Sequence, residues 1–384
     1  MRFNNTVQPE YIYLHWPFCP YKCHFCDFVA LASHEQFMEQ YHEALCQEIM
    51  QFGQRYAQKM PVKTIFLGGG TPSTYPDRLL LDMFDTLRKV YNFDHATEVS
   101  IEVNPGTVRD EQLLLWEKVG INRLSIGVQS LKDAVLKKLN RHQLATDVQN
   151  LLEKASKRFN NISVDLILGL PGVSEADWKS LIEQVVAWPI KHVSIYFLTV
   201  HENTPLYFNI QRKRVTLPHD ESLVDLYHWS RDILQQHGFL HYEISNFAKE
   251  GFQSRHNTAY WNHKPYIGLG LGACSFDGQR RFQNSKNLMH YINGVNNHED
   301  VVYFEESLTM DQQWLETVML GLRQIRGFDI NASLAKLPKE QQEKIRKKIG
   351  ELEQRKFVEY NGDNLILTPT GLVLENEVII ALSP

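Results

Sequence analysis

The sequence predicts an α/β fold in which parallel strands alternate with helices to form an open, partial (β/α)6 barrel. Short apolar, β-branched runs recur along the first 200 residues, and each is followed by a helical, amphipathic stretch. About six such units are present. Strand–helix repeats of this kind form right-handed crossovers in a parallel sheet. Six units are fewer than the eight of a closed barrel, so we expect the barrel to be open.

The six predicted strands are nearly continuous in apolar residues, which is typical of parallel strands covered on both faces. They span residues 11–16, 63–70, 98–105, 122–130, 161–171 and 191–200. Amphipathic helices are predicted over residues 34–57, 77–91, 110–120 and 174–188. Ligands of open parallel sheets bind at the carboxyl ends of the strands, so we expect the functional site there.

The pattern changes near residue 300, where we place the boundary between a barrel over residues 1–300 and a small domain over residues 301–384. Helices are predicted over residues 309–327 and 338–357. Residues 357–371 follow with two alternating runs around an Asn-Gly pair, which is a strong hairpin signal. Helices followed by a hairpin predict a winged-helix-like α+β domain.

The composition narrows the class of protein. Of the 384 residues, 43% are apolar, which is enough for a sizeable core, and the formal net charge is −5. Acidic and basic residues are interspersed, so nothing indicates a nucleic-acid partner. The N-terminal segment lacks the apolar run of a signal peptide, and no stretch is long enough to span a bilayer. We therefore expect a cytoplasmic, soluble protein without an integral membrane segment.

Three of the five cysteines lie within eight residues, directly after the first predicted strand. Cys19, Cys23 and Cys26 have the spacing C-x3-C-x2-C. In a reducing compartment such a group binds metal more often than it forms disulfides. We interpret the three thiolates as ligands of a cubane iron–sulfur cluster, whose fourth iron stays open to a small molecule. Zinc with His15 or His24 as a fourth ligand, and a chance grouping of ordinary cysteines, are the alternatives.

This motif resembles that of the radical S-adenosylmethionine (SAM) family. The flanking "YLHWPFC" (residues 13–19) resembles, more narrowly, the oxygen-independent coproporphyrinogen III oxidase branch of that family. The match runs over most of the chain. The resemblance implies a radical-SAM partial barrel, a [4Fe–4S] cluster on the three cysteines, and an exchangeable SAM on the open iron. In the family, one electron from the cluster can cleave SAM to a deoxyadenosyl radical.

The resemblance also implies a set of SAM contacts, most of them at successive strand ends. Glycines in "GGGTPS" (68–73) permit a close backbone approach, and an arginine can form a charge-assisted pair with the SAM carboxylate. Each residue alone would also fit a helix cap or a buried polar group, and it is their joint placement that indicates a site. The predicted contacts are Tyr13, Gly69, Gly70, Thr71, Glu102, Gln129, Arg141 and Asp165.

The branch contains two kinds of protein: the oxidase, which decarboxylates coproporphyrinogen III, and the heme chaperone group (HemW), which binds heme and passes it to acceptor proteins. The oxidases resemble a C-x3-C-x2-C-x-C pattern, with a further cysteine two residues after the third, and this sequence has Phe28 at that position. The oxidases also carry a longer arm before the first strand, whereas only about ten residues precede it here. Both features favour the chaperone group. So does a third, an H-N-x-x-Y-W motif that resembles the heme-binding signature of that group: His256, Asn257, Tyr260 and Trp261.

A neutral imidazole is a standard axial ligand of heme iron, and aromatic rings can pack on a porphyrin face. We therefore expect His256, in a loop, to bind heme. A hydrogen bond that shapes the "GLGLG" turn (268–272) is its alternative role. Cys274 stands where relatives more often have histidine, and we expect it to be buried and inert, with Cys46 in the helical core.

The predicted function is that of a heme chaperone that carries a [4Fe–4S] cluster, SAM and heme, and delivers heme to heme proteins or membrane-bound oxidases. An oxygen-independent coproporphyrinogen III oxidase, which converts coproporphyrinogen III to protoporphyrinogen IX, is the alternative. Whether the protein is an enzyme is therefore left open at this point, with oxidase activity disfavoured.

Overall fold

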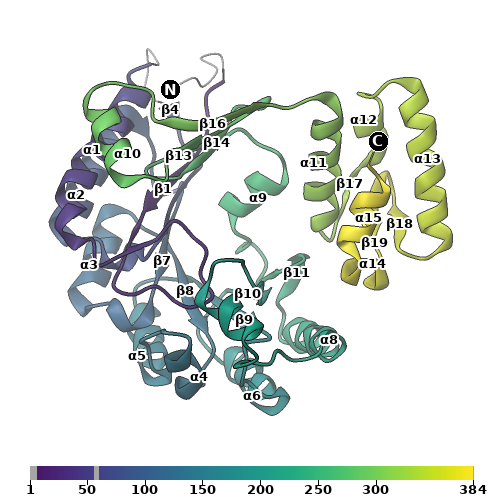
Figure 1. Ribbon diagram of the computed structural model, residues 1–384, viewed down its shortest axis with the longest axis horizontal. Helices are drawn as coiled ribbons and strands as arrows, with labels where there is room; N and C mark the ends of the chain where they lie inside the picture. The colour runs from purple at the N-terminus through teal and green to yellow at the C-terminus, as the bar shows by residue number, and fades with distance from the viewer. Residues whose placement is uncertain (1–6, 56–59, 384) are drawn as a thin grey trace.

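The computed structural model describes residues 7–55 and 60–383, and it contains the predicted alternation of strands and helices (Figure 1). Within these residues the main sheet has nine strands, in the order β11-β12-β10-β9-β8-β7-β5-β1-β13. The central six pair in parallel with their neighbours. They are β1 (Tyr11–Trp16), β5 (Thr64–Gly69), β7 (Glu98–Val103), β8 (Arg123–Gln129), β9 (Asn161–Leu168) and β10 (His192–Phe197). The predicted partial (β/α)6 barrel is confirmed.

Short strands that the sequence did not predict extend both edges of this sheet. At one edge β13 (Ile267–Leu269) pairs in parallel with β1. At the other edge β12 (Asn246–Ala248) and β11 (Leu240–Glu243) continue the sheet in antiparallel fashion beyond β10. A separate antiparallel sheet contains β14 (Cys274–Phe276), β15 (Arg280–Asn284) and β16 (Val302–Ser307). Short parallel pairs are formed by β2 (Phe18–Cys19) with β3 (Leu31–Ala32) and by β4 (Met60–Pro61) with β6 (Tyr91–Asn92).

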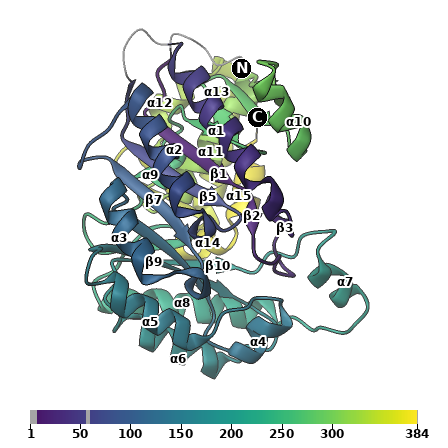
Figure 2. The ribbon, with the colours of Figure 1, turned by 90° about the vertical axis from the view of Figure 1, so that its left-hand side faces the viewer.

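Helices cover the outer face of the barrel, as Figures 1 and 2 show. The barrel helices are α1 (Met38–Gly53), α2 (Asp77–Val90), α3 (Asp110–Val119), α4 (Asp133–Lys138), α5 (Ala145–Ala155), α6 (Glu175–Val185), α7 (Pro205–Gln211), α8 (Asp220–Gln236), α9 (Arg255–Trp261) and α10 (Leu288–Asn296). In Figure 2, α7 stands away from the body of the barrel. The helix predicted over residues 34–57 corresponds to α1, and its last two residues lie outside the described part of the chain.

The core follows from the apolar strand sequences. In β1 the side chains of Ile12, Leu14 and Trp16 are fully buried, and the neighbouring strands contribute residues of the same kind. Burying a side chain of this size stabilises the fold by about 1.5–3 kcal/mol each, so the continuous apolar strands are the main source of barrel stability. No helix in the described residues combines the length and the apolar content needed to cross a membrane.

The C-terminal part has its own core, which runs from Trp314 to Leu382. Its elements are α11 (Met310–Arg323), β17 (Phe328–Asp329), α12 (Ile330–Leu334), α13 (Lys339–Gln354), β18 (Val358–Asn361), β19 (Asn364–Leu367), α14 (Pro369–Val373) and α15 (Glu375–Ala381). The strands form an antiparallel sheet in the order β17-β19-β18. A two-residue loop joins the hairpin strands and begins with Gly362 at φ 61°. This is the predicted winged-helix-like domain.

The position of the boundary between the two parts stays a prediction. Residues 302–307 form β16, which pairs with β15 of the sheet beside the barrel. The buried residues of the second core begin only at Trp314.

Candidate cofactor site

The three clustered cysteines line one cavity, of about 470 Å³, at the carboxyl ends of the barrel strands. Cys19 ends β2, and the other two lie on the irregular loop that follows. The Cys26 N–H donates to the carbonyl of Cys23, with a distance of 3.2 Å, and so keeps that loop compact. All three thiols are free and line the same cavity, and three thiolates are the ligands that an iron–sulfur cluster with one open iron needs.

The three thiols are partly or fully shielded from solvent: Cys23 is buried, and Cys19 and Cys26 are half-buried. Burial raises the pKa of Cys19 to about 11. A hydrogen-bonding contact of 3.0 Å between its Sγ and Thr71 Oγ1 acts in the opposite direction and is the weaker effect. Burial raises the pKa of Cys26 as well. Iron binds the thiolate form, so a bound cluster must supply the positive charge that holds the protons off.

The glycine-rich loop after β5 packs directly on the cysteine loop. The N–H of Gly70 donates to the carbonyl of Trp16 at 2.7 Å, and the N–H of Thr71 donates to the carbonyl of Phe18 at 2.9 Å. A Cβ at Gly70 would lie 2.5 Å from the carbonyl oxygen of Pro17. Glycine is therefore required at this position by the contact between the two loops, whatever ligand binds beside them.

Two carboxyl groups lie in the wall of the cavity. Glu102 accepts a hydrogen bond from the Gly69 N–H at 3.0 Å, and burial raises its pKa to about 8. Asp165 accepts one from the Ser125 hydroxyl at 2.9 Å, and burial also raises its pKa. Protonated near neutral pH, Glu102 can donate as well as accept hydrogen bonds toward a ligand in the cavity.

Arg141 and Gln129 complete the polar wall. Arg141 donates to the Gly127 carbonyl at 2.6 Å, and its Nη1 lies 3.8 Å from Cys23 Sγ, so it brings a fixed positive charge to the cysteines. Gln129 has φ 63°, uncommon for a residue other than glycine, and lies where the β8–β9 register shifts. Strained backbone of this kind is concentrated at functional sites.

Tyr13 is the one predicted SAM contact outside the described lining of the cavity, although it lies close to Glu102. Seven of the eight line the cavity together with the cysteines, whereas the lining described in the structure does not include Tyr13. Its hydroxyl donates to His15 Nδ1 at 2.9 Å, because His15 Nε2 donates to the Val29 carbonyl at 2.8 Å. Burial lowers the pKa of His15 to about 4 and keeps this imidazole neutral. With both nitrogens engaged, His15 offers no lone pair to zinc.

The H-N-x-x-Y-W motif lies elsewhere. Its residues form helix α9, not a loop, and the Ser254 hydroxyl caps the helix by accepting from the Asn257 N–H at 3.2 Å. His256 is 1% exposed, and each of its ring nitrogens is hydrogen-bonded to a hydroxyl group. Thr64 Oγ1 lies 2.6 Å from Nδ1, and Tyr260 Oη lies 2.8 Å from Nε2. Burial lowers its pKa to about 3.

Thr64 begins β5, so α9 closes the amino-terminal end of the barrel, opposite the cysteines. The alternative role predicted for His256, a bond to the "GLGLG" turn, is not the one that the structure has, since its partners are Thr64 and Tyr260. Trp261 is placed against the C-terminal domain, with the Arg323 guanidinium 4.7 Å from its ring centroid.

Two expectations about the remaining cysteines differ in outcome. Cys274 is exposed, so the prediction of a buried thiol is wrong. A Cβ at Gly268 would lie 2.0 Å from the Cys274 carbonyl oxygen, so the backbone of Cys274 packs closely on β13. Cys46 is half-buried and packs against the barrel core, as predicted.

Sequence reasoning missed several residues of the cavity wall. They are Tyr21, Asn104, Ser125, Tyr196, Phe197 and His201. Asn104 lies next to the end of the predicted strand 98–105, so the strand-end rule could have found it, whereas Tyr196 lies in the middle of the predicted strand 191–200. Asp27, directly after the last cysteine, forms an ion pair of 3.1 Å with His201, and Phe28 is 66% exposed at the cavity mouth.

Comparison with known proteins identifies the family. The radical SAM superfamily model matches residues 13–185, and a model of the HemN C-terminal domain matches residues 308–374. The chain is 34% identical to a heme chaperone HemW of Synechocystis sp., over 98% of this chain and 92% of that protein. It is 32% identical to a HemW of Bacillus subtilis, over 95% of this chain and 97% of that protein.

The fold has a close counterpart among solved structures. The coproporphyrinogen III oxidase HemN of Escherichia coli, described as a radical SAM enzyme, superposes with a TM-score of 0.83, covering 98% of this chain and 90% of that chain. At 23% identity this likeness shows the fold alone. The full-length similarity to HemW proteins is what decides the family: the chain belongs to the HemW family of radical SAM proteins.

Proposed function

We propose that this protein is a heme chaperone, which binds heme and transfers it to acceptor hemoproteins while carrying a [4Fe–4S] cluster and SAM. The observation that carries the proposal is the 34% identity to a heme chaperone HemW over 98% of the chain. Phe28 supports it, because an exposed phenyl ring stands at the cavity mouth where the oxidases have a further cysteine.

Cys19, Cys23 and Cys26 are the proposed ligands of the cluster. When bound, such a cluster supplies an iron with an open coordination position for the amino and carboxylate groups of SAM. Among the residues of this chain, Arg141 neutralises negative charge beside Cys23, and its guanidinium can pair with a ligand carboxylate. Glu102 and Asp165 face the same cavity with carboxyl oxygens that can form hydrogen bonds to a ribose.

His256 is the proposed heme ligand, with Asn257, Tyr260 and Trp261 beside it. In the structure the Tyr260 hydroxyl lies on Nε2 and the Thr64 hydroxyl on Nδ1. Iron binding therefore requires one of these bonds to break and α9 to move outward. The neutral imidazole is ready to coordinate iron, because burial lowers its pKa to about 3.

A heme titration followed by the Soret absorbance tests this role, with wild type compared with His256→Gln and Tyr260→Phe. His256→Gln keeps a hydrogen-bonding side chain and should lose heme. Tyr260→Phe keeps the aromatic ring but frees one imidazole nitrogen, and should bind heme at least as tightly as wild type. Equal affinity of His256→Gln and wild type would remove His256 from the site.

The oxidase remains the second candidate, favoured by the likeness of fold to HemN. The same preparation, with its cluster assembled, is incubated with SAM, a reductant and coproporphyrinogen III. We expect heme binding without conversion to protoporphyrinogen IX. Robust conversion would overturn the chaperone proposal and leave the cluster assignment standing.

A further inference from the structure

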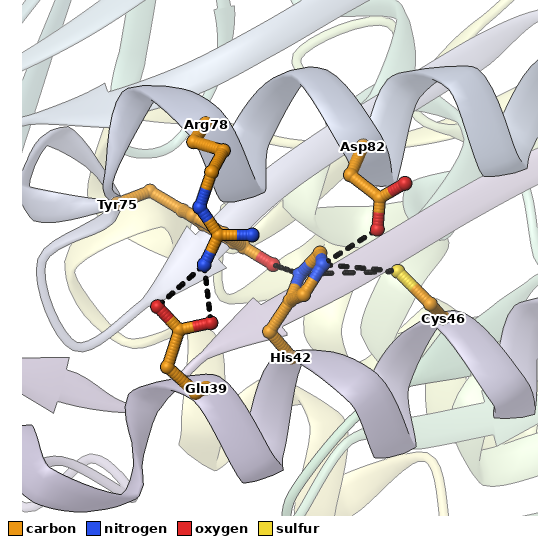
Figure 3. A network of polar contacts seen from close by, with 6 residues as sticks. All are labelled: Glu39, His42, Cys46, Tyr75, Arg78 and Asp82. Atoms are coloured by element: carbon orange, nitrogen blue, oxygen red, sulfur yellow. Dashed lines mark hydrogen bonds and ion pairs between the residues drawn. The ribbon is translucent and has the colours of Figure 1, made fainter.

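A second group of metal-binding side chains lies outside the cofactor cavity, between α1 and α2. His42 and Cys46 are one turn apart on α1, and Asp82 faces them from α2 (Figure 3). His42 Nε2 lies 2.9 Å from Asp82 Oδ2 and 3.6 Å from Cys46 Sγ. One ligand atom from each of the three side chains lies within 4.8 Å of the other two.

A hydrogen bond to Tyr75 fixes the orientation of the His42 ring, as a metal ligand requires. His42 is 3% exposed, and the hydroxyl of Tyr75 lies 2.9 Å from its Nδ1. That contact leaves Nε2 directed toward Asp82, while Cys46 Sγ lies beside the ring, 3.6 Å from Nε2 and 3.8 Å from Nδ1. Histidines that bind metals are usually fixed in this way, by a polar group on the nitrogen that does not bind the ion.

The approach to the group is open on one side. The Asp82 side chain is 57% exposed, so an ion can enter from solvent past this carboxylate. Arg78, one turn earlier on α2, directs its hydrogen bonds to Glu39 and not to Asp82: its guanidinium donates to both carboxylate oxygens of Glu39, at 2.7 and 2.5 Å (Figure 3).

We propose that His42, Cys46 and Asp82 bind a divalent transition-metal ion of the zinc class, with water as the fourth ligand. Imidazole, thiolate and carboxylate are all zinc ligands, at about 2.0–2.3 Å from the metal. A tetrahedral ion with such bonds needs its ligand atoms roughly 3.3–3.6 Å apart, which small rotations of Cys46 and Asp82 provide.

The protons balance in a simple way. Without an ion, Nε2–H of His42 donates to Asp82, and the Cys46 thiol is protonated because burial raises its pKa to about 12. In the bound form the imidazole proton is on Nδ1, where the Tyr75 oxygen accepts it, and the thiol proton is released to solvent. Binding therefore releases one proton and weakens as the pH falls.

The site lies directly behind the cofactor loops. The ring of Tyr75 stacks on Trp16 with centroids 3.7 Å apart, and the indole N–H of Trp16 donates to Thr74 Oγ1 at 3.3 Å. Thr74 belongs to the turn that follows the glycine-rich loop, and α1 follows the cysteine loop. An ion between α1 and α2 would tie together the two helices that follow these loops.

The test is zinc binding to the full chain with its cluster already assembled, so that Cys19, Cys23 and Cys26 are occupied. Calorimetric titration should give one zinc per chain, and cobalt(II) should give the visible spectrum of a tetrahedral site with a thiolate ligand. Cys46→Ser and Asp82→Asn should each lose most of the affinity. Tyr75→Phe, which keeps the ring, should weaken binding by about 10–100-fold.

Asp85→Asn and Cys274→Ser are the matched controls. Asp85 lies on the same helix, with a side chain that is 68% exposed, and Cys274 is an exposed thiol elsewhere. Both controls should bind zinc as wild type does. Equal affinity of Cys46→Ser, Asp82→Asn and the controls would overturn the site, and so would the absence of zinc binding to wild type. Neither result depends on heme.

Discussion

Replacing Cys19 tests the cluster assignment, because its Sγ lies in the cavity wall, 3.0 Å from Thr71 Oγ1. Cys19→Ala removes one of the three thiols that line the cavity. We expect this variant to lose the visible absorbance of thiolate-bound iron after cluster assembly. Cys274→Ala, which removes an exposed thiol outside the cavity lining, should keep it. Retention of the absorbance in Cys19→Ala would show that the ligand assignment is wrong.

Gly70 illustrates a residue whose type is fixed by packing. Gly70→Ala places a methyl group 2.5 Å from the Pro17 carbonyl oxygen, a backbone atom that cannot move without displacing the cysteine loop. We expect a loss of about 1–3 kcal/mol in the free energy of unfolding, measured with urea, and poorer cluster assembly. In contrast, Gly350→Ala on α13 meets no described atom within 4 Å and should stabilise the protein by about 0.5–1 kcal/mol.

The residues at the strand ends could be foreseen because parallel strands bring their carboxyl ends to one edge. Glu102 and Gln129 lie at the ends of β7 and β8, as their positions in the sequence predicted, whereas Asp165 lies in the middle of β9 and still lines the cavity. His201 could not be foreseen in this way, because it lines the cavity from the loop that follows β10, and no sequence period encodes how that loop folds back.

At the scale of an element, α1 is joined to the rest of the barrel by a buried carboxyl group. Glu48 is 2% exposed and accepts hydrogen bonds from the Gly270 N–H at 2.7 Å, the Asn284 amide at 2.8 Å and the Tyr291 hydroxyl at 2.8 Å. Burial nevertheless raises its pKa to about 7, from the usual 4.5 of a glutamate. One side chain thus connects α1 to α10 and to the segment around β13.

This shift predicts a pH dependence. The folded state holds the Glu48 proton more tightly than the unfolded state does. The protonated carboxyl therefore makes its full contribution to the free energy of unfolding below about pH 4.5, and this contribution is lost as the pH rises through about 7. The loss amounts to about 3 kcal/mol. Urea unfolding of wild type and Glu48→Gln near pH 5 and near pH 8 measures it: the advantage of wild type should shrink at the higher pH.

Glu43→Gln, at an exposed position on the same helix, reports the general effect of removing a carboxyl group there. A difference between wild type and Glu48→Gln that is the same at both pH values would contradict the assigned pKa.

The strands and long helices were predictable because their periodicity extends over many residues. Every predicted barrel strand begins within one residue of its observed start. Helix α9 was missed because seven residues are too few to show a period. Its start is set by tertiary contacts instead: a carboxyl group from β7, Glu98, accepts the N–H groups of Arg255 and His256, both at 3.1 Å.

At the scale of the whole molecule, one buried ion pair joins the barrel to the C-terminal domain. Arg323 at the end of α11 lies 2.9 Å from the carboxylate of Glu243, which ends β11 and is fully buried. The same guanidinium donates to the Ser245 hydroxyl at 3.0 Å and covers the ring of Trp261. The chain beyond α11 also bonds to the β11 edge, where the Ile325 N–H donates to the Tyr242 carbonyl at 3.2 Å.

Breaking this pair should loosen the domain junction as a unit. Arg323→Met leaves Glu243 buried without its counterion, and we expect a loss of about 3–5 kcal/mol in the free energy of unfolding. The double variant Glu243→Gln/Arg323→Met removes both charges and should recover part of that loss. Lys347→Met, at an exposed position on α13, should change stability by less than about 0.5 kcal/mol.

The same variants also test whether the C-terminal domain restrains α9, the helix that carries the H-N-x-x-Y-W motif. Trp261 is the last residue of α9, so Arg323→Met also frees the end of the helix that carries His256. If α9 has to move for His256 to reach heme iron, Arg323→Met should bind heme faster than wild type in stopped-flow measurements, while Lys347→Met should not. Identical binding rates in all three proteins would mean that the C-terminal domain does not restrain α9, and that heme reaches the protein by another path.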